Sequence, residues 1–393
     1  NGWAFYDWAN SVYSLVISTA VFPLYYSAVT DGKVVSFLGM EWDHPDSLYS
    51  YALSFSFLVV AFISPILSGI ADYTGSKKKF MKFFCWMGGL SVASLYFFDG
   101  IDTVWIGIVF TILASIGFWA SLVFYNAYLP EVASPDRHDK VSAKGFSMGY
   151  LGASILLIIC LVLVQFIGVW EDTPEWCFPL VALWWIGFAQ VTYKVLPNRS
   201  GEKKKINKEI LSHGFKELKS VFKEMRKHKR LKTFLSSFFV FSMGIQTVML
   251  MAVMYAKKEL GVDQTVLITS VLIIQFVAIG GAYIFSWLSK KIGNIKTLML
   301  GLIFWIVGCV YAYVLQDPNH FYYLAAIIGL VMGGSQALSR STYSKYLPET
   351  KDTASFFSFF DITEKVGIII GMVILGFLEG IWEMRTSGLS LVV

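Results

Sequence analysis

The sequence predicts an all-α, polytopic membrane protein, and three observations lead to this prediction. Of its 393 residues, 56% are hydrophobic and only 15% are charged, and the mean hydropathy is +0.60. Apolar runs long enough to cross about 30 Å of hydrocarbon, which takes roughly 20 helical residues, recur along the chain. The loops between these runs carry their cations on alternate sides. A soluble globule of this size needs far more polar surface than this chain offers.

Eleven apolar runs are predicted to be membrane-spanning helices. In order, they cover residues 8–26, 49–71, 80–98, 104–129, 146–169, 178–196, 234–256, 266–288, 298–315, 321–338 and 356–378. A twelfth run starts at Gly388. The sequence begins at Asn1 without a Met and stops inside this last run, so we expect both ends to be truncated here.

The loops that follow even-numbered spans are basic, and the opposite loops are mainly acidic. Lys and Arg residues near the ends of the spans mark the cytoplasmic side of a polytopic protein. The cations are Lys77, Lys78, Lys79, Lys82, Arg137, Lys140, Lys144, Lys290, Lys291, Lys296, Arg340, Lys345 and Lys351. The acids are Asp31, Glu41, Asp43, Asp46, Asp99, Asp102, Glu171, Asp172 and Glu175. We therefore expect a cytoplasmic N-terminus, and the net charge of +5 gives no indication of nucleic-acid binding.

One long charged segment, 198–232, separates the sixth span from the seventh. Its apolar residues step by four, three, four and three, which predicts an amphipathic helix: Leu211, Phe215, Leu218, Phe222 and Met225. We interpret it as a cytoplasmic linker lying on anionic lipid headgroups, with a partner-binding segment as the alternative. The linker divides the chain into a six-helix bundle, 1–197, and a second, incomplete bundle, 233–393.

The two halves share a repeat with a fixed offset. "YNAYLPE", which starts at Tyr125, returns as "YSKYLPE" from Tyr343, an offset of 343 − 125 = 218. The same offset carries Gly75 onto Gly293. The pattern predicts two parallel pseudo-repeats of six helices, an architecture used for alternating access with the substrate site between the halves.

The loop after the second span contains "SGIADYTGSKKKF", which starts at Ser68. It resembles the signature of the major facilitator superfamily, and Asp72, Gly75, Lys77 and Lys78 match that pattern. The resemblance implies the major facilitator fold and a conformational latch in this loop. Gly75 permits a tight turn, and Asp72 can bind a helix N-terminus or a cation in one conformation. The alternative is a solvated, charged turn.

Longer blocks narrow the resemblance. "GWAFYDWANSVYSLVISTAVFPLYY", "FYNAYLPEVASPDRHDKVSAKGFSMGYLG", "GGSQALSRSTYSKYLPE" and "SFFSFFDITEKVGIIIG" are similar to the vacuolar amino-acid effluxer (autophagy-related) family of that superfamily. The family implies twelve helices and secondary active transport, with amino-acid efflux assigned to its fungal members. The short loops resemble those of bacterial members, which implies a bacterial inner (plasma) membrane. We expect a monomer.

The eleventh span carries the densest set of ionisable residues, Asp361, Glu364 and Lys365. Such residues are costly in a membrane helix unless they are paired or face a cavity. Asp361 and Lys365 stand at i and i+4 and can pair, which leaves one net negative charge if all three ionise. We predict a role in substrate binding or proton coupling. The alternative is an ion-paired cluster that fastens this span to the second or tenth, with Asp72 and Arg340 as partners.

Polar residues in other spans are weaker candidates. Asp7, Ser11, Ser14 and Ser18 step by four, three and four along the first span, with Asn10 on the same side. We interpret Asn10, Ser11 and Ser14 as the wall of a central cavity and Asp7 as a helix cap or a cytoplasmic gate. Gln246 and Gln336 can hydrogen-bond a zwitterionic substrate, or they can bond between helices.

The remaining chemistry-bearing residues do not indicate an enzyme. The four Cys lack the spacing of a zinc site or disulfide, the five His lie in loops or the linker, and there is no Gly-Lys-Ser/Thr motif for ATP. We predict no metal, no cofactor and no catalytic residue. The predicted function is alternating-access transport of a small polar solute, an amino acid first, with protons as the coupling ion. The alternatives are a carrier of another metabolite or drug-like compound, and a non-transporting receptor or scaffold on the same fold.

Overall fold

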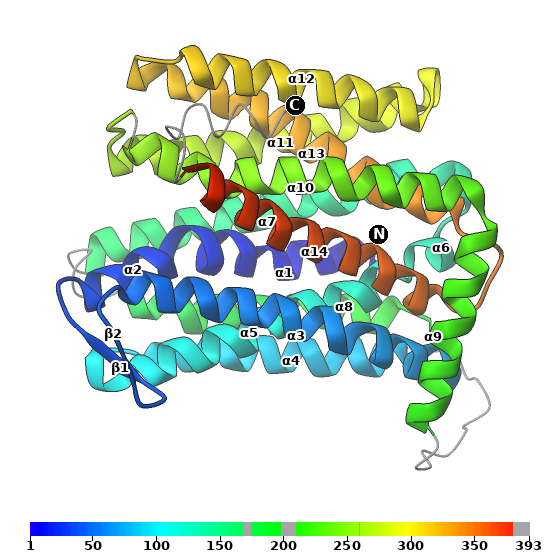
Figure 1. Cartoon of the computed structure of the whole chain (residues 1–393), viewed down its shortest axis with the longest axis horizontal. Helices are drawn as coiled ribbons and strands as arrows, with labels where there is room; N and C mark the ends of the chain where they lie inside the picture. Colours follow the sequence, from blue (N-terminus) through cyan, green and yellow to red (C-terminus); the bar gives the residue numbers. More distant parts are fainter. Residues whose placement is uncertain (168–173, 198–209, 259, 380–393) are drawn as a thin grey trace. The chain divides into compact units, whose positions relative to one another are not determined.

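The computed structural model describes residues 1–167, 174–197, 210–258 and 260–379, and almost all of them are helical (Figure 1). Within this part, ten helical segments are long and apolar enough to cross a membrane: Phe5–Thr30, Pro45–Thr74, Lys77–Phe97, Ile101–Val132, Pro135–Val164, Pro174–Val195, Lys229–Met249, Thr265–Ile292, Asn294–Val314 and Pro318–Tyr346. The all-α, polytopic prediction is therefore confirmed. The predicted twelfth span lies outside the described residues.

The chain forms two compact units, which are described one at a time. Unit 1 comprises Asn1–Tyr128, Leu151–Ser220 and Lys351–Ser358, and unit 2 comprises Leu129–Tyr150, Val221–Thr350 and Phe359–Val393. The chain passes from one unit to the other within α7 (His138–Ile167), α9 (Ile210–Lys227) and α14 (Thr353–Glu379). Each unit therefore contains residues from both halves of the sequence. The helix α9 lies in the predicted linker.

Unit 1 is a bundle of neighbouring helices. It contains α3 (Pro45–Thr74), α4 (Lys77–Ser94), α5 (Val104–Asn126) and α8 (Cys177–Val195), which run alongside one another in Figure 1. The helix α4 packs against α5 and α8, and α3 packs against α5. Gly88 and Gly117 make the α4–α5 crossing close, because a Cβ atom at Gly117 would stand 2.5 Å from the Gly88 Cα.

The first span is continuous but changes its helical form. It starts as α1 (Phe5–Val12), continues as a π-helical segment, η1 (Tyr13–Val21), and ends as α2 (Phe22–Thr30). In η1 the Thr19 hydroxyl donates to the Ser14 carbonyl, five residues earlier, at 2.9 Å. Pro23 follows directly, and because proline has no N–H, a carbonyl in the preceding turn loses its helical donor. Such wide turns are rare and often occur at functional sites.

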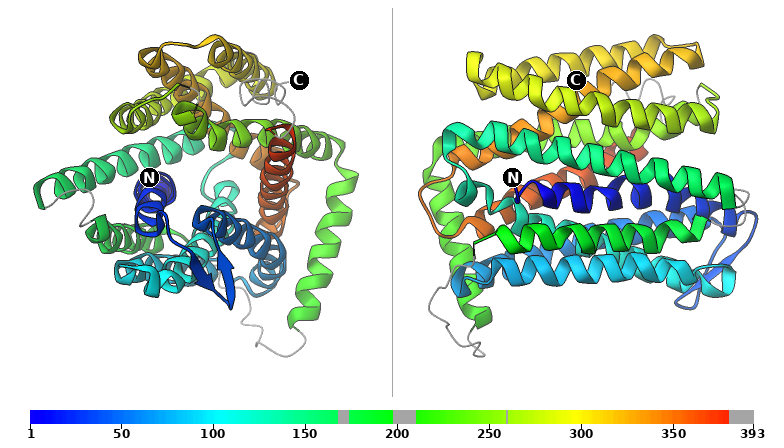
Figure 2. Two further views of the ribbon diagram at one scale, coloured as in Figure 1. Left: turned by 60° about the vertical axis from the view of Figure 1, so that its left-hand side comes forward. Right: turned by 180° about the vertical axis from the view of Figure 1, so that it is seen from behind.

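A two-stranded hairpin follows α2, where the sequence analysis predicts only a loop. Strands β1 (Val35–Phe37) and β2 (Met40–Trp42) pair antiparallel, with Val35 opposite Trp42, and appear as blue arrows in Figure 2. Leu38 and Gly39 make the turn with φ of 53° and 77°, a left-handed conformation that glycine adopts without steric cost.

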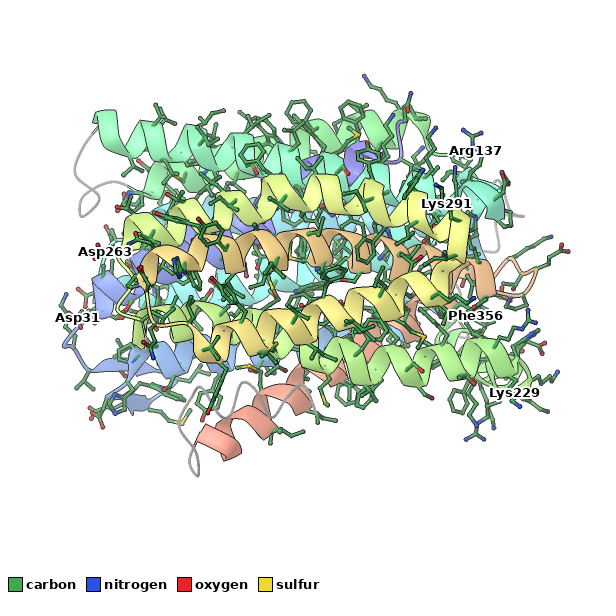
Figure 3. The ribbon with its side chains drawn as sticks, turned by 90° about the horizontal axis from the view of Figure 1, so that it is seen from above. Asp31, Arg137, Lys229, Asp263, Lys291 and Phe356 are labelled. Carbon is green, nitrogen blue, oxygen red and sulfur yellow. The ribbon has the colours of Figure 1, made fainter. Side chains whose placement is uncertain are left out.

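Unit 2 contains α10 (Lys229–Lys258), α11 (Gln264–Ile292), α12 (Asn294–Val314) and α13 (Phe321–Tyr346). The helix α13 packs against α10, α11 and α12. Of the charged side chains labelled in Figure 3, Arg137, Lys229 and Lys291 lie at one end of the helices of this unit and Asp263 lies at the other. The short elements of the chain are η2 (Leu95–Phe97), η3 (Ile101–Thr103), α6 (Leu129–Val132), η4 (Pro135–Arg137), η5 (Pro174–Trp176) and η6 (Pro318–His320).

Candidate functional site

The predicted charged trio forms one cluster on α14 in unit 2. The Lys365 Nζ lies 3.2 Å from Asp361 Oδ1 and 3.4 Å from Glu364 Oε2. The predicted i, i+4 pair of Asp361 with Lys365 is therefore present. The Lys365 side chain is completely buried, and the Asp361 side chain is 9% exposed. A buried ammonium with two carboxylates places one excess negative charge inside the unit when all three groups are ionised.

The helix α10 contributes to this cluster through close helix packing. The Gln246 Nε2 donates to Glu364 Oε1 at 3.0 Å. Two glycines on α14, one and two turns after the trio, allow the approach: a Cβ at Gly367 would lie 3.4 Å from the Phe239 carbonyl oxygen, and a Cβ at Gly371 would collide with the Thr247 hydroxyl. The predicted site residue Gln246 is thus a neighbour of the trio.

The predicted latch residue Asp72 binds the first turn of α14 in unit 1. Its carboxylate accepts hydrogen bonds from the backbone N–H groups of Ala354 at 3.2 Å and Ser355 at 2.7 Å. These N–H groups have no partner within the helix, and the positive end of the helix dipole favours a negative charge here. The Lys77 Nζ donates to the Thr353 hydroxyl at 2.6 Å and lies 4.0 Å from Asp72 Oδ1.

The other residues of this motif hold the same end of unit 1 together. Gly75 ends α3 with φ 65°, the left-handed conformation that stops a helix at low cost. The Lys78 Nζ donates to the Leu196 carbonyl at the end of α8, at 2.9 Å. Asp72 and Lys77 are buried, so the alternative of a solvated, charged turn does not describe this loop.

Asp72→Asn should lower the stability of unit 1, because an amide offers one oxygen where two N–H groups of α14 now bind a carboxylate. We expect a loss of roughly 1–3 kcal/mol, the usual cost of removing a hydrogen bond to a charged group. The apparent Tm of the purified protein in detergent measures it. Asp102→Asn, at an exposed position, is the matched control. Equal Tm values for the two variants would show that the Asp72 contact contributes nothing.

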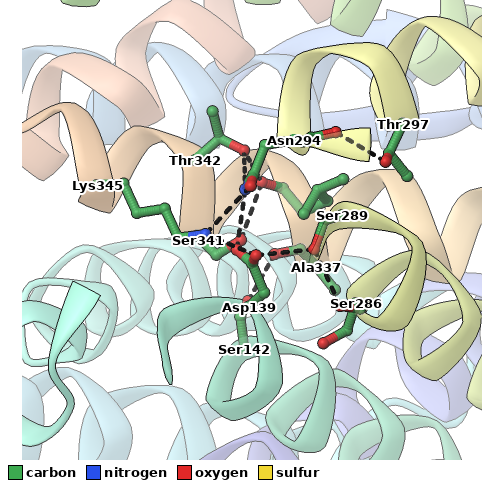
Figure 4. A network of polar contacts seen from close by, with 12 residues as sticks. Asp139, Ser142, Ser286, Ser289, Asn294, Thr297, Ala337, Ser341, Thr342 and Lys345 are labelled. Atoms are coloured by element: carbon green, nitrogen blue, oxygen red, sulfur yellow. Dashed lines mark hydrogen bonds and ion pairs between the residues drawn. The ribbon is translucent and has the colours of Figure 1, made fainter. Parts of the chain in front are cut away.

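Unit 2 contains a second polar network that the sequence analysis missed (Figure 4). Asp139, near the start of α7, accepts from Lys345 Nζ at 2.6 Å, Asn294 Nδ2 at 2.9 Å and the Ser289 hydroxyl at 2.8 Å. Asn294 also donates to the Thr342 hydroxyl at 2.9 Å. One buried carboxylate thereby joins α7 to α11, α12 and α13. An open pocket of about 340 Å³ lies beside it, lined in part by Asn294, Lys296 and Lys345.

Two further predicted residues bind α7 in unit 2. The Arg340 guanidinium donates to both the hydroxyl and the carbonyl oxygen of Ser142, each at 3.0 Å, and lies 4.1 Å from the Phe146 ring centre. Gln336 accepts from the Tyr150 hydroxyl at 2.8 Å. The interhelical alternative for Gln336 therefore has a partner in the structure. Arg340 and Asp72, which the sequence analysis suggests as partners of the trio, bind Ser142 and the start of α14.

The residues of the predicted polar stripe on the first span differ in burial: some lie within the helix bundle and others are exposed. Asp7 is buried and accepts from the Tyr125 hydroxyl at 2.8 Å. Asn10 is also buried, and its amide nitrogen has no hydrogen-bond partner among the described residues. Ser11 is half-buried and Ser14 is exposed. Ser14 therefore remains a candidate for a water-facing wall, whereas Asp7 and Asn10 lie within the bundle. Among the described residues, no three His, Cys, Asp or Glu side chains are grouped as a metal site.

Comparison with known proteins assigns this chain to a family. Residues 1–383 match the model of the family described as "Vacuole effluxer Atg22 like". The chain is 33% identical over 378 residues to YxiO of Bacillus subtilis (strain 168), an uncharacterized MFS-type transporter, covering 94% of this chain and 86% of YxiO. It is 26% identical over 448 residues to autophagy-related protein 22-1 of Penicillium rubens, covering 90% and 74%.

The fold has a solved counterpart as well. The outward conformation of FucP, a major facilitator superfamily transporter from E. coli, superposes with a TM-score of 0.69 at 13% identity, covering 100% of this chain and 94% of FucP. This likeness identifies the fold. The predicted major facilitator fold is confirmed, and the chain is a membrane transporter rather than an enzyme. It belongs to the vacuole effluxer Atg22-like family of the major facilitator superfamily.

Proposed function

We propose that this transporter moves amino acids, or closely related small zwitterions, by secondary active transport coupled to protons. The observation that carries the proposal is the Asp361, Glu364 and Lys365 cluster on α14, in which Asp361 and Lys365 are buried. Ionisable groups inside a membrane helix are expensive and mark solute or ion pathways. The excess carboxylate can take up a proton, and the adjacent ammonium and carboxylate groups offer counterparts for a zwitterion's two charges.

We further propose a cytoplasmic N-terminus and the inner membrane of a bacterium. The support is the position of the cations in unit 2, where Arg137, Lys229 and Lys291 lie at one end of the helices and Asp263 lies at the other (Figure 3). With the basic end inside, the odd spans run outward. Family membership supports a transport function, since the family is described as vacuole effluxer-like.

Uptake into proteoliposomes with an imposed pH gradient tests the proposed function. A mixture of the standard amino acids is supplied outside, and the internal solutes are quantified by mass spectrometry. We expect at least one amino acid to accumulate with the gradient and to stop accumulating when a protonophore collapses it. Empty liposomes are the control.

Two outcomes would contradict this proposal. Accumulation of another metabolite from a wider library, with no amino acid moving, would identify the alternative carrier. No flux and no proton movement would favour a receptor or scaffold. A thermal-shift screen should precede the assay, because a ligand stabilises the fold in proportion to the logarithm of its concentration over its Kd.

A further inference from the structure

We propose that Asp361 is the residue that carries the proton, and that Glu364 is the fixed negative partner of Lys365. This inference rests on the proposed proton coupling and assigns different roles to two carboxylates only three residues apart on α14. The assignment follows from the hydrogen-bond partners of the four carboxylate oxygens.

Glu364 has a donor for each of its oxygens. Its Oε1 accepts from Gln246 Nε2 at 3.0 Å, and its Oε2 accepts from Lys365 Nζ at 3.4 Å. Its side chain is 21% exposed, so it is also the more accessible of the two acids. A carboxylate with two donors and some solvent is stable in its charged form.

Only one of the two carboxylate oxygens of Asp361 has a partner among the described residues. Its Oδ1 lies 3.2 Å from Lys365 Nζ, whereas its Oδ2 is buried and has no hydrogen-bond partner among the described residues. A buried charged oxygen without a donor is destabilising. A proton on Oδ2 removes the uncompensated charge and requires no group already present to give up a bond. Asp361 is therefore the carboxylate that gains most from protonation.

Among the described residues, no second positive charge acts on Asp361. The charged groups that act on it are Lys365 and Glu364, both on its own helix. From α10 the cluster receives the neutral Gln246, and beside Asp361 the Phe360 ring stacks on that of Tyr343 in α13, with 4.8 Å between the ring centres. When Asp361 takes a proton from water, the cluster changes from a net charge of −1 to zero, and Lys365 keeps Glu364 as its partner.

Asp361→Asn and Glu364→Gln form a matched pair, because each replaces one acid by its neutral isostere. Two modes of transport are compared in proteoliposomes: accumulation driven by a pH gradient, and exchange of labelled for unlabelled solute without a gradient. We expect Asp361→Asn to lose accumulation and to retain exchange, because Asn imitates the protonated state. Glu364→Gln should be slower in both modes and should still accumulate solute. Accumulation by Asp361→Asn, or a loss of accumulation confined to Glu364→Gln, would overturn the assignment.

An infrared measurement keeps the assignment testable without a known substrate. Protonation of a buried carboxylate that has no hydrogen-bond partner should produce a C=O stretching band at higher wavenumber than the bands of the solvated carboxylic acids, and [¹³C]aspartate labelling should shift this band. The band should be absent from Asp361→Asn and present in Glu364→Gln, even when a variant transports nothing. If the band shifts with [¹³C]glutamate instead, or survives in Asp361→Asn, the inference is wrong. If the wild type moves no amino acid but shows the Asp361 band, only the proposed function fails.

Discussion

Gly281→Leu is expected to prevent folding of unit 2, whereas Gly280→Leu, one residue earlier, should be tolerated. Gly281 lies where α11 crosses α13, and a Cβ there would collide with the Leu330 carbonyl oxygen and stand 3.0 Å from the Leu330 Cα. Backbone atoms of a packed helix cannot rotate aside as a side chain can. Gly329 and Gly333 make the same kind of contact from α13, against the backbone of Ile274 and Ala278.

The expected cost of Gly281→Leu is at least about 3 kcal/mol, the upper end of the usual penalty for overpacking, because two helices must separate. Gly280 is exposed and has open space around its Cβ position, and Leu has the better helix propensity there. Size-exclusion chromatography of both variants, extracted in mild detergent, measures the folded fraction. A monodisperse peak of wild-type size from Gly281→Leu would show that α11 and α13 do not approach as closely as described.

Gly280 and Gly281 also show what the hydropathy and composition of the sequence can predict and what they cannot. Apolar runs of about 20 residues predicted ten spanning helices correctly, because the membrane imposes the length and the hydrogen bonding of each helix. The eleventh run, 356–378, is helical as α14 but is not among these ten. Adjacent glycines such as Gly280 and Gly281 predict a close approach of helices, but not which of the two faces a neighbour. The hairpin at Val35–Trp42 was missed because three-residue strands in a polar loop carry too little alternation to be recognised.

The candidate sites differ in how far the sequence could predict them. Asp361 and Lys365 stand out as charges in an apolar run, and their i, i+4 spacing correctly predicted the pair. Asp72 was predicted to bind a helix N-terminus, but its target, the start of α14, is 282 residues away in the chain, and only tertiary structure identifies it. Asp139 was missed because one acid among the cations of a loop looks like ordinary solvated charge.

A signal for the Asp139 network was nevertheless available. The repeat offset of 218 places Asn294 at the position of Ser76, so the loop before α12 corresponds to the loop that contains the Asp72 motif. In unit 1 the last turn of α3, just before this loop, supplies the carboxylate, Asp72, and α14 supplies backbone donors. In unit 2 the helix α7 supplies the carboxylate, Asp139, and the first residue of α12, Asn294, supplies a donor just after the corresponding loop. The carboxylate and its donors therefore come from opposite partners in the two repeats. For this reason the second repeat has no matching Asp at the position of Asp72.

The Asp139 network yields the second large prediction, a loss of roughly 3 kcal/mol for Asp139→Ala, at the low end of the range for breaking a buried pair. The substitution leaves the Lys345 ammonium, 2.6 Å away, without its carboxylate and removes the acceptor of Asn294 and Ser289. The low end applies because the Lys345 side chain is 23% exposed and water can solvate part of its charge.

A double-mutant cycle with Lys345→Met separates the pair from its surroundings. We expect the double variant to be more stable than the sum of the single effects predicts, by more than about 1 kcal/mol, because no unpaired charge remains. The apparent Tm in detergent is the measurement. Glu224→Ala is the matched control, since Glu224 pairs with Lys227 at 2.8 Å on exposed positions of α9, where solvent screens the pair. Additive effects at Asp139 and Lys345, or a Tm change no larger than that of Glu224→Ala, would show that this carboxylate does not hold α7 to the rest of unit 2.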